Sequence, residues 1–185
     1  MNDPEIIEAF CARNEDAIAE SKKKYGDYCV YIAKNVLHDD GEAEECLNDA
    51  LLAAWQSIPP QRPENLKAYL GKLSREIAID RWRANTRKKR VRSEYVRSLD
   101  EIGGIVSGGD LCDELGEAEL SREISRFLYS IDETKRNVFI RRYWYCDPVK
   151  SICRRYGFGK SKVLMMLKRT RDDLAEHLKK EGYIK

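Results

Sequence analysis

The chain has little of what metal centres and disulfide frameworks require. It has two histidines, His38 and His177, and none of its six cysteines belongs to a C-x-x-C pair. Because zinc sites and redox motifs usually show such pairs, we expect neither a metal nor a cofactor, and cysteines that stay reduced. Cys29, Cys46 and Cys153 fall on apolar helical stripes, where a thiol acts as a small apolar side chain.

Long apolar runs are missing too. No segment approaches the roughly 18 consecutive apolar residues of a membrane span. The acidic first residues, MNDPEIIEAF, lack the basic head and apolar run of a signal peptide. We therefore expect a cytoplasmic protein, and the 42% apolar content is sufficient for packed cores.

Internal repeats and strand-like alternation of any useful length are also absent, and the pattern that remains is helical. Apolar residues from Tyr25 to Val36 recur at the spacing of one buried helix face. Asp39 and Asp40 supply an N-cap for a second helix, which the prolines from Pro59 onward end. A third helix runs from about Leu66 into a basic tail that reaches Arg92. These signals predict an all-α fold.

Residues 98–118 lose this periodicity and collect glycine and acidic residues. Such a composition is typical of a linker. We predict two small helical domains, residues 1–97 and residues 119–185, joined by a flexible acidic linker.

The second domain carries three helix signals in succession. Ser130–Glu133 has the S-x-x-E form of a capping box, which predicts the start of a helix. Asp147 and Pro148 predict an N-cap followed by proline at the first helical position. A short helix over 148–156, a glycine-containing turn and a longer helix over 160–178 then predict a helix-turn-helix.

In a DNA-binding helix-turn-helix, the second helix enters the major groove and its first residues meet base edges. The alternative is a plain helical hairpin with a solvated basic face. Local charge favours DNA, because Lys135–Arg171 contains twelve lysines and arginines against one aspartate, a charge of +11. The candidate DNA contacts are Lys160, Ser161, Lys162, Met165, Lys168 and Arg169.

Charge is sorted into blocks along a chain whose net charge is only +2. Residues 1–60 carry −8, residues 75–97 carry +6 and residues 98–123 carry −7. Two basic surfaces separated by an acidic linker predict that the protein binds a polyanion at two places. The acidic N-terminal block requires a different partner.

One helical face in that block holds Glu42, Glu45 and Asp49, with Glu44 and Asn48 beside them. Three interpretations fit it: a solvated helix side, paired carboxylates for acid/base chemistry, or a docking surface for a basic protein. The surrounding sequence offers no pocket-forming loops, metal-ligand cluster or nucleophile. We therefore favour a docking surface and do not expect an enzyme.

The segment Arg75–Arg83 mixes cations with an aromatic residue and continues into the basic run Arg87–Arg90. Phosphate contacts supply affinity for nucleic acid, and aromatic faces stack on exposed bases. Trp82 fits this role and a place in the core about equally well.

Together these pieces resemble a bacterial RNA polymerase sigma factor of the sigma-70 family, in its compact extracytoplasmic-function (ECF) group. Gly41–Trp55 followed by Ala68–Asp80 is similar to the family's region two, and Ser151–Val163 onward resembles region four. The likeness covers about residues 25–90 and 120–178.

The resemblance implies a non-enzymatic factor, monomeric when alone, that lends core RNA polymerase its promoter specificity. The acidic face would dock on the β′ clamp, and the loop and helix after it would read and melt the minus-ten element. The helix-turn-helix would read the minus-thirty-five element and touch the β flap, while the linker threads through the polymerase. An anti-sigma protein is a further candidate partner. The implied polymerase contacts are Glu42, Glu44, Glu45, Asn48 and Asp49. The implied DNA contacts of the first domain are Gln61, Arg62, Asn65, Lys72, Arg75, Arg81, Trp82, Arg83, Arg87 and Lys88.

The sequence departs from the family at Glu76, which stands where an asparagine facing DNA is expected. A carboxylate close to phosphates is unfavourable. Two alternatives stay open: a stand-alone helix-turn-helix regulator, which would usually dimerise, and a Mg²⁺-dependent enzyme acting on nucleic acid through Glu45 and Asp49.

Overall fold

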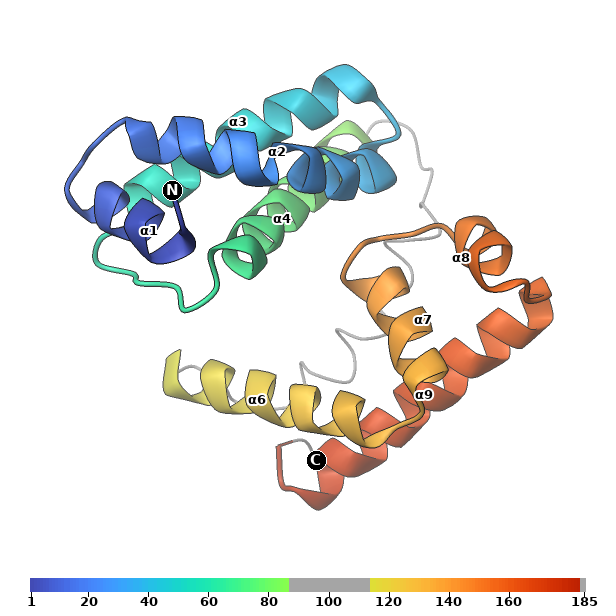
Figure 1. Cartoon of the computed structure of the whole chain (residues 1–185). Coiled ribbons are helices and arrows are strands. Elements are labelled where there is room, and N and C mark those ends of the chain that lie inside the picture. Colours follow the sequence, from blue (N-terminus) through green and yellow to red (C-terminus); the bar gives the residue numbers. More distant parts are fainter. Residues whose placement is uncertain (87–113, 184–185) are drawn as a thin grey trace. The chain divides into compact units, whose positions relative to one another are not determined.

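The structure, a computed structural model, describes residues 1–86 and 114–183, with side chains at 1–85 and 119–183. Within these residues every regular element is an α-helix, as predicted (Figure 1). The chain divides into two compact units, Met1–Val91 and Arg92–Lys185, called here the first and second unit. Most of the predicted linker lies outside the described residues.

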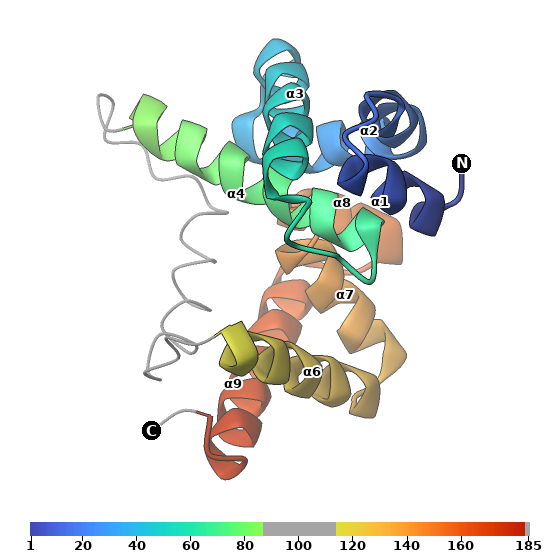
Figure 2. The ribbon, with the colours of Figure 1, turned by 90° about the vertical axis from the view of Figure 1, so that its left-hand side faces the viewer.

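Four helices form the described part of the first unit. They are α1 (Asp3–Cys11), α2 (Asp16–Leu37), α3 (Asp40–Ser57) and α4 (Leu66–Thr86). The helices α2, α3 and α4 pack against one another in pairs, and α1 packs on α2 (Figure 2). Their inward faces meet in one apolar core that includes Phe10, Cys29, Leu51 and Leu70.

Helix α1 was not predicted from the sequence, although its signal is present. Asn2 caps it by accepting a hydrogen bond from the Glu5 amide at 2.9 Å, while the Glu5 carboxylate accepts one from the Asn2 amide. This reciprocal arrangement satisfies two amides that the helix itself leaves unpaired. Ile6 and Phe10 are fully buried, so α1 is part of the core of the first unit.

The limits of α3 agree with the prediction. The Asp39 carboxylate accepts a hydrogen bond from the Glu42 amide at 2.9 Å, and the helix ends at Ser57, before the prolines. On its buried face, the Cys46 thiol donates to the Ser74 carbonyl at 3.2 Å. Burial raises the pKa of Cys46 to about 12 and also raises that of Cys29. Both thiols therefore stay protonated and act as apolar core groups.

Helices α2 and α4 approach each other closely at Gly71. A Cβ atom there would lie 2.5 Å from the Tyr28 hydroxyl oxygen, well inside van der Waals contact. The Lys67 ammonium lies 5.0 Å from the centre of the Tyr28 ring. Gly71 thus provides the space that the Tyr28 side chain occupies.

The described part of the second unit is built around one long helix. Its elements are α6 (Glu114–Ser130), α7 (Glu133–Tyr143), α8 (Val149–Tyr156) and α9 (Lys160–Lys180), and α9 contacts the other three. The predicted inward residues of α9 are all buried: Val163, Leu167, Leu174 and Leu178. Helix α6 already begins at Glu114, so the last residues of the predicted linker, 114–118, belong to this helix.

Two predicted helix starts in this unit were wrong in detail. Asp132, not Ser130, caps α7 by accepting a hydrogen bond from the Lys135 amide at 3.1 Å. The Ser130 hydroxyl instead donates to the Phe127 carbonyl. Asp147 does not cap α8, because its buried carboxylate lies 2.9 Å from Nε of Arg141 in an ion pair. In both places the side chain that local sequence predicts as the cap binds another partner instead: Ser130 binds the Phe127 carbonyl and Asp147 pairs with Arg141.

None of the helices in the described residues is both long and apolar enough to cross a membrane. The same residues contain no group of His, Cys, Asp and Glu side chains that is able to hold a metal ion.

Candidate protein and nucleic-acid interfaces

The acidic residues of α3 lie on the exposed side of the helix. Glu44, Glu45, Asn48 and Asp49 are exposed, and Glu42 is half-buried. Leu52 lies one turn after Asn48 and is 52% exposed. The face is therefore acidic with an apolar residue within it. The sequence itself contains a hint, since Leu52 is one residue out of phase with the inward leucines Leu47 and Leu51.

The side chains of this acidic face contact two neighbouring helices, α4 and α2. Glu42, Glu45 and Asp49 bond to α4. Arg81 donates to Glu45 at 2.9 Å and to Asp49 at 2.5 Å, and the Asn85 amide donates to Glu42 at 3.1 Å. The hydrogen bonds from Arg81 to Glu45 and Asp49 raise the pKa of the guanidinium, which remains charged.

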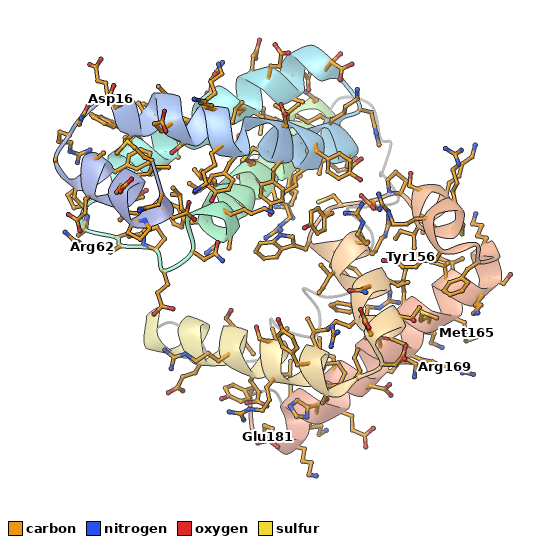
Figure 3. The ribbon with its side chains drawn as sticks, viewed as in Figure 1. Asp16, Arg62, Tyr156, Met165, Arg169 and Glu181 are labelled. Atoms are coloured by element: carbon orange, nitrogen blue, oxygen red, sulfur yellow. The ribbon has the colours of Figure 1, made fainter. Side chains whose placement is uncertain are left out.

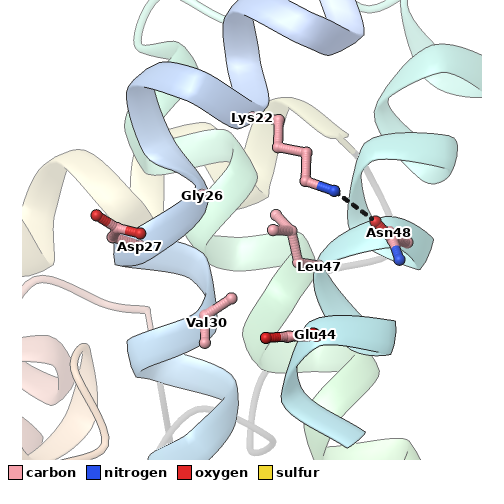
Figure 4. A pocket seen from close by; sticks show the side chains of 7 residues that line it. All are labelled: Lys22, Gly26, Asp27, Val30, Glu44, Leu47 and Asn48. Carbon is pink, nitrogen blue, oxygen red and sulfur yellow. Dashed lines mark hydrogen bonds between the residues drawn. The ribbon is translucent and has the colours of Figure 1, made fainter. Parts of the chain in front are cut away.

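The other two residues of the acidic face, Glu44 and Asn48, lie beside α2. Glu44 and Asn48 line a shallow pocket of about 310 Å³ together with Lys22, Gly26, Asp27, Val30 and Leu47. The Lys22 ammonium lies 3.5 Å from the Asn48 side-chain oxygen across this pocket (Figure 4). The five predicted docking residues thus come from one helix but border two different helices.

The loop before α4 brings Gln61, Arg62 and Asn65, three of the predicted nucleic-acid contacts, to the surface. Each of them also has a structural partner. Asn65 caps α4 by accepting a hydrogen bond from the Ala68 amide at 2.9 Å, and Gln61 accepts one from the Tyr69 hydroxyl at 2.7 Å. Arg62, beside α1 in Figure 3, pairs with Glu8 at 2.8 Å. The loop is therefore fixed to both α1 and α4.

Two predicted DNA-contacting cations of α4 pair with acids on the same helix. Lys72 and Glu76 are 4.0 Å apart, and Arg83 lies 3.6 Å from Asp80. Glu76, which departs from the family pattern, therefore faces a cation within its own helix.

The remaining predicted residues of this segment are Arg75 and Trp82, which are half-buried, and Arg87 and Lys88, which lie outside the described residues. Trp82 is neither enclosed in the core nor fully exposed, so both interpretations of it stay open.

The segment α8–turn–α9 lies close to its predicted bounds. Helix α8 begins at Val149, one residue later than predicted, and α9 begins at Lys160 as predicted but ends at Lys180, two residues later. Gly157 ends α8 with φ of 65°, a left-handed conformation that suits glycine at this position. Gly159 is the N-cap of α9. The Lys162 ammonium lies 3.7 Å from the centre of the Phe158 ring, which holds the first turn of α9 against the turn.

All six predicted contact residues of α9 are exposed, and Figure 3 shows Met165 and Arg169 on its outward side. Met165 is 52% exposed and its neighbour Leu164 is 43% exposed. Among the described residues, no carboxylate pairs with Lys160, Lys168 or Arg169. This surface combines cations for phosphate with apolar groups that are able to contact a thymine methyl group. Leu164 was missed in the sequence because its spacing places it beside the buried Val163.

Part of the chain matches a known protein family. Residues 23–88 match the family described as Sigma-70 region 2. The matched residues include most of α2, all of α3, the loop after it and all of α4, so they contain the acidic residues of α3 together with Arg81. No curated protein matches the chain. The family match supports a role in RNA polymerase binding and promoter recognition, while α8 and α9 lie outside it.

Proposed function

We propose that this protein is a sigma factor of the sigma-70 family, of the ECF type, that binds core RNA polymerase and directs it to promoter DNA. The observation that carries the proposal is the match of residues 23–88 to Sigma-70 region 2. We further propose that it acts in the cytoplasm, catalyses no reaction itself and is monomeric when alone.

The exposed face of α3 is the proposed polymerase contact. Its carboxylates suit a basic partner surface on the β′ clamp, and Leu52 adds apolar area at the same place.

DNA contacts are proposed at two places. The loop with Gln61, Arg62 and Asn65, together with α4, would read and open the minus-ten element. Helix α9 would enter the major groove at the minus-thirty-five element with Lys160, Ser161, Lys162 and Met165 towards base edges. Lys168 and Arg169 would hold phosphates a turn further on.

The polymerase contact is tested by mixing the purified chain with core RNA polymerase and measuring co-elution. Charge reversal at Glu44 is the most direct variant, since no ion pair of Glu44 exists among the described residues. Glu45 and Asp49 are less suitable because each is bonded to Arg81, so reversal there would also disturb the contact between α3 and α4.

We expect native chain to co-elute and Glu44→Lys to bind at least about tenfold more weakly, as expected for a charge placed against a basic surface. The matched control is Glu176→Lys, an identical change at an exposed position of α9, outside residues 23–88. Glu176→Lys should bind core RNA polymerase as tightly as the native chain does. If the native chain does not co-elute, the sigma-factor proposal is wrong.

A stand-alone DNA-binding regulator is the second candidate. The exposed cations of α9 favour it, because they need no polymerase to contact phosphate. It predicts a dimer in sedimentation and tight binding of the isolated chain to promoter duplex at physiological salt. The sigma-factor proposal predicts a monomer and weak DNA binding without polymerase.

A further inference from the structure

Arg81 connects the two surfaces to which separate functions have been assigned. It belongs to α4, on which the DNA contacts are proposed, but its guanidinium is bonded to Glu45 and Asp49 of the docking face. The Arg81 side chain is 28% exposed, whereas that of Glu45 is 71% exposed. The cation is thus partly covered, while one of its carboxylate partners remains open to an approaching molecule.

We propose that Arg81 is a positioning residue that couples polymerase docking to DNA binding. In the polymerase-free chain, Glu45 and Asp49 hold the guanidinium. A basic side chain of the polymerase that docks on these carboxylates displaces Arg81, whose guanidinium then becomes available to a DNA phosphate. This inference rests on the proposed function, because it takes the docking partner to be basic and the ligand of α4 to be DNA.

The exchange is energetically easy. An ion pair at the surface contributes only about 0–1 kcal/mol, so a competing cation is able to replace it. Glu45 and Asp49 lie one turn apart on α3, and one guanidinium spans both because its donors form a rigid fork. An incoming cation that takes Glu45 would leave Arg81 with one partner instead of two.

The neighbouring pair on the same side strengthens the argument. Asn85 lies one turn after Arg81 and donates to Glu42, which lies three residues before Glu45. The acidic face therefore binds two successive turns of α4. A partner docked on that face competes with the whole contact, which makes the orientation of the end of α4 depend on docking.

The first test uses the chain without polymerase and a short DNA duplex of arbitrary sequence, with binding measured by fluorescence anisotropy over a range of salt concentrations. Glu45→Gln and Glu44→Gln remove the same charge from adjacent positions of α3, but only Glu45 bonds to Arg81. We expect Glu45→Gln to bind about threefold to tenfold more tightly. The slope of log K against log salt should steepen by up to about 0.9, the value for one complete additional phosphate contact on duplex DNA, because Asp49 still holds part of the guanidinium. Glu44→Gln should stay within about twofold of the native chain.

A double-mutant cycle identifies Arg81 as the cause. In an Arg81→Met background, Glu45→Gln should give no gain beyond that of Glu44→Gln, because the guanidinium that it releases is gone. Thermal unfolding of every variant shows that each is folded. The coupling is overturned if the gain persists without Arg81, or if Glu44→Gln and Glu45→Gln behave alike.

The second test uses the holoenzyme assembled with core polymerase. Arg81→Met should co-elute with polymerase at least as well as the native chain does, because docking no longer has to displace a guanidinium, yet it should reduce promoter binding by the holoenzyme about threefold to tenfold. The same substitution should change DNA binding by the polymerase-free chain by less than twofold, since Arg81 is already engaged there. An equal loss in both states would overturn the proposal. Failure of the native chain to co-elute, with the duplex result intact, would refute the sigma-factor function but leave the Arg81–Glu45 control of DNA binding in place.

Discussion

The first unit pairs most of its predicted DNA-contacting cations with surface carboxylates, whereas the second unit buries an ion pair and leaves the predicted DNA-contacting cations of α9 exposed. In the first unit, four of the predicted DNA-contacting cations meet carboxylates: Arg62, Lys72, Arg81 and Arg83. In the second unit, the Arg141–Asp147 pair lies between α7 and α8 with Asp147 fully buried. The described residues contain no carboxylate paired with Lys160, Lys168 or Arg169.

This difference shows that a positive charge in the sequence and a positive charge available to a ligand are separate quantities. The segment 75–97 carries +6, but much of its described part faces acids within the same unit. Helix α9 presents its cations directly. We therefore expect the second unit to dominate DNA binding by the polymerase-free chain, and ion pairs to affect stability differently in the two units.

The largest expected effect is on the buried pair. Asp147→Ala should lower the free energy of unfolding of the second unit by about 3 kcal/mol, because Arg141 loses its carboxylate where little water reaches it. The same loss at the surface, Glu8→Ala beside Arg62, should cost about 0–1 kcal/mol. Urea unfolding followed by circular dichroism measures both, and equal costs would remove the contrast between the units.

Next in size is the loss of the exposed cations. Lys168→Gln/Arg169→Gln should weaken duplex binding by the polymerase-free chain about 10- to 100-fold and reduce the salt slope by about 2, the value for two phosphate contacts. Lys179→Gln/Lys180→Gln is a matched control, since it removes two exposed cations from the far end of the same helix. Similar losses of DNA affinity in both variants would show that α9 contributes to DNA binding through its total charge and not through contacts of Lys168 and Arg169.

A smaller effect, of opposite sign, is expected at Glu76. Glu76→Gln removes the carboxylate that faces Lys72 and should tighten duplex binding about twofold to threefold, as expected for one screened surface charge. In a Lys72→Gln background the gain should shrink. A fall in affinity on neutralising Glu76 would mean that this acid positions Lys72 for DNA.

The last expected effect concerns the pH dependence of stability. Burial tends to raise the pKa of Asp3, but hydrogen bonds from Lys24 and Tyr25 at 2.6 Å outweigh it and leave the pKa below its ordinary 3.8. A carboxylate whose pKa is lowered in the folded state stabilises that state above its unfolded pKa, and the contribution is lost as pH falls through the folded pKa. Asp3→Asn should therefore cost up to about 1 kcal/mol near neutral pH and progressively less below about pH 4. Thermal unfolding at several pH values measures this, and a difference that does not change with pH would exclude a role for the Asp3 charge.

The sequence predicted those features that depend on one helix at a time. Periodicity located the buried faces of α3 and α9, and caps and breakers located the ends of α3 and the turn at Gly157. The fold class followed from the same signals. Helix α1 was missed although its capping box is visible in the sequence, because the segment was considered only as a possible secretion signal.

What could not be predicted depends on which side chains of different helices lie opposite one another. Periodicity places Glu45 on an outward face of its helix, but nothing local shows that Arg81 of α4 reaches it. Likewise, Asp147 before a proline has the local features of a cap, and only the folded unit brings Arg141 close enough to take its carboxylate. The candidate residues were therefore mostly found at the surface, as predicted, while their pairing emerged only from the tertiary structure.

The close approach at Gly71 has a consequence for protein engineering. A glycine in the middle of a helix is a common target for stabilisation, because replacing it with alanine favours the helix by about 1 kcal/mol. Here the added methyl group would meet the Tyr28 ring, and overpacking of this kind costs about 1–3 kcal/mol. A thermostabilised version of this protein should therefore keep Gly71 and take its helix-favouring substitutions from solvent-facing positions of α4.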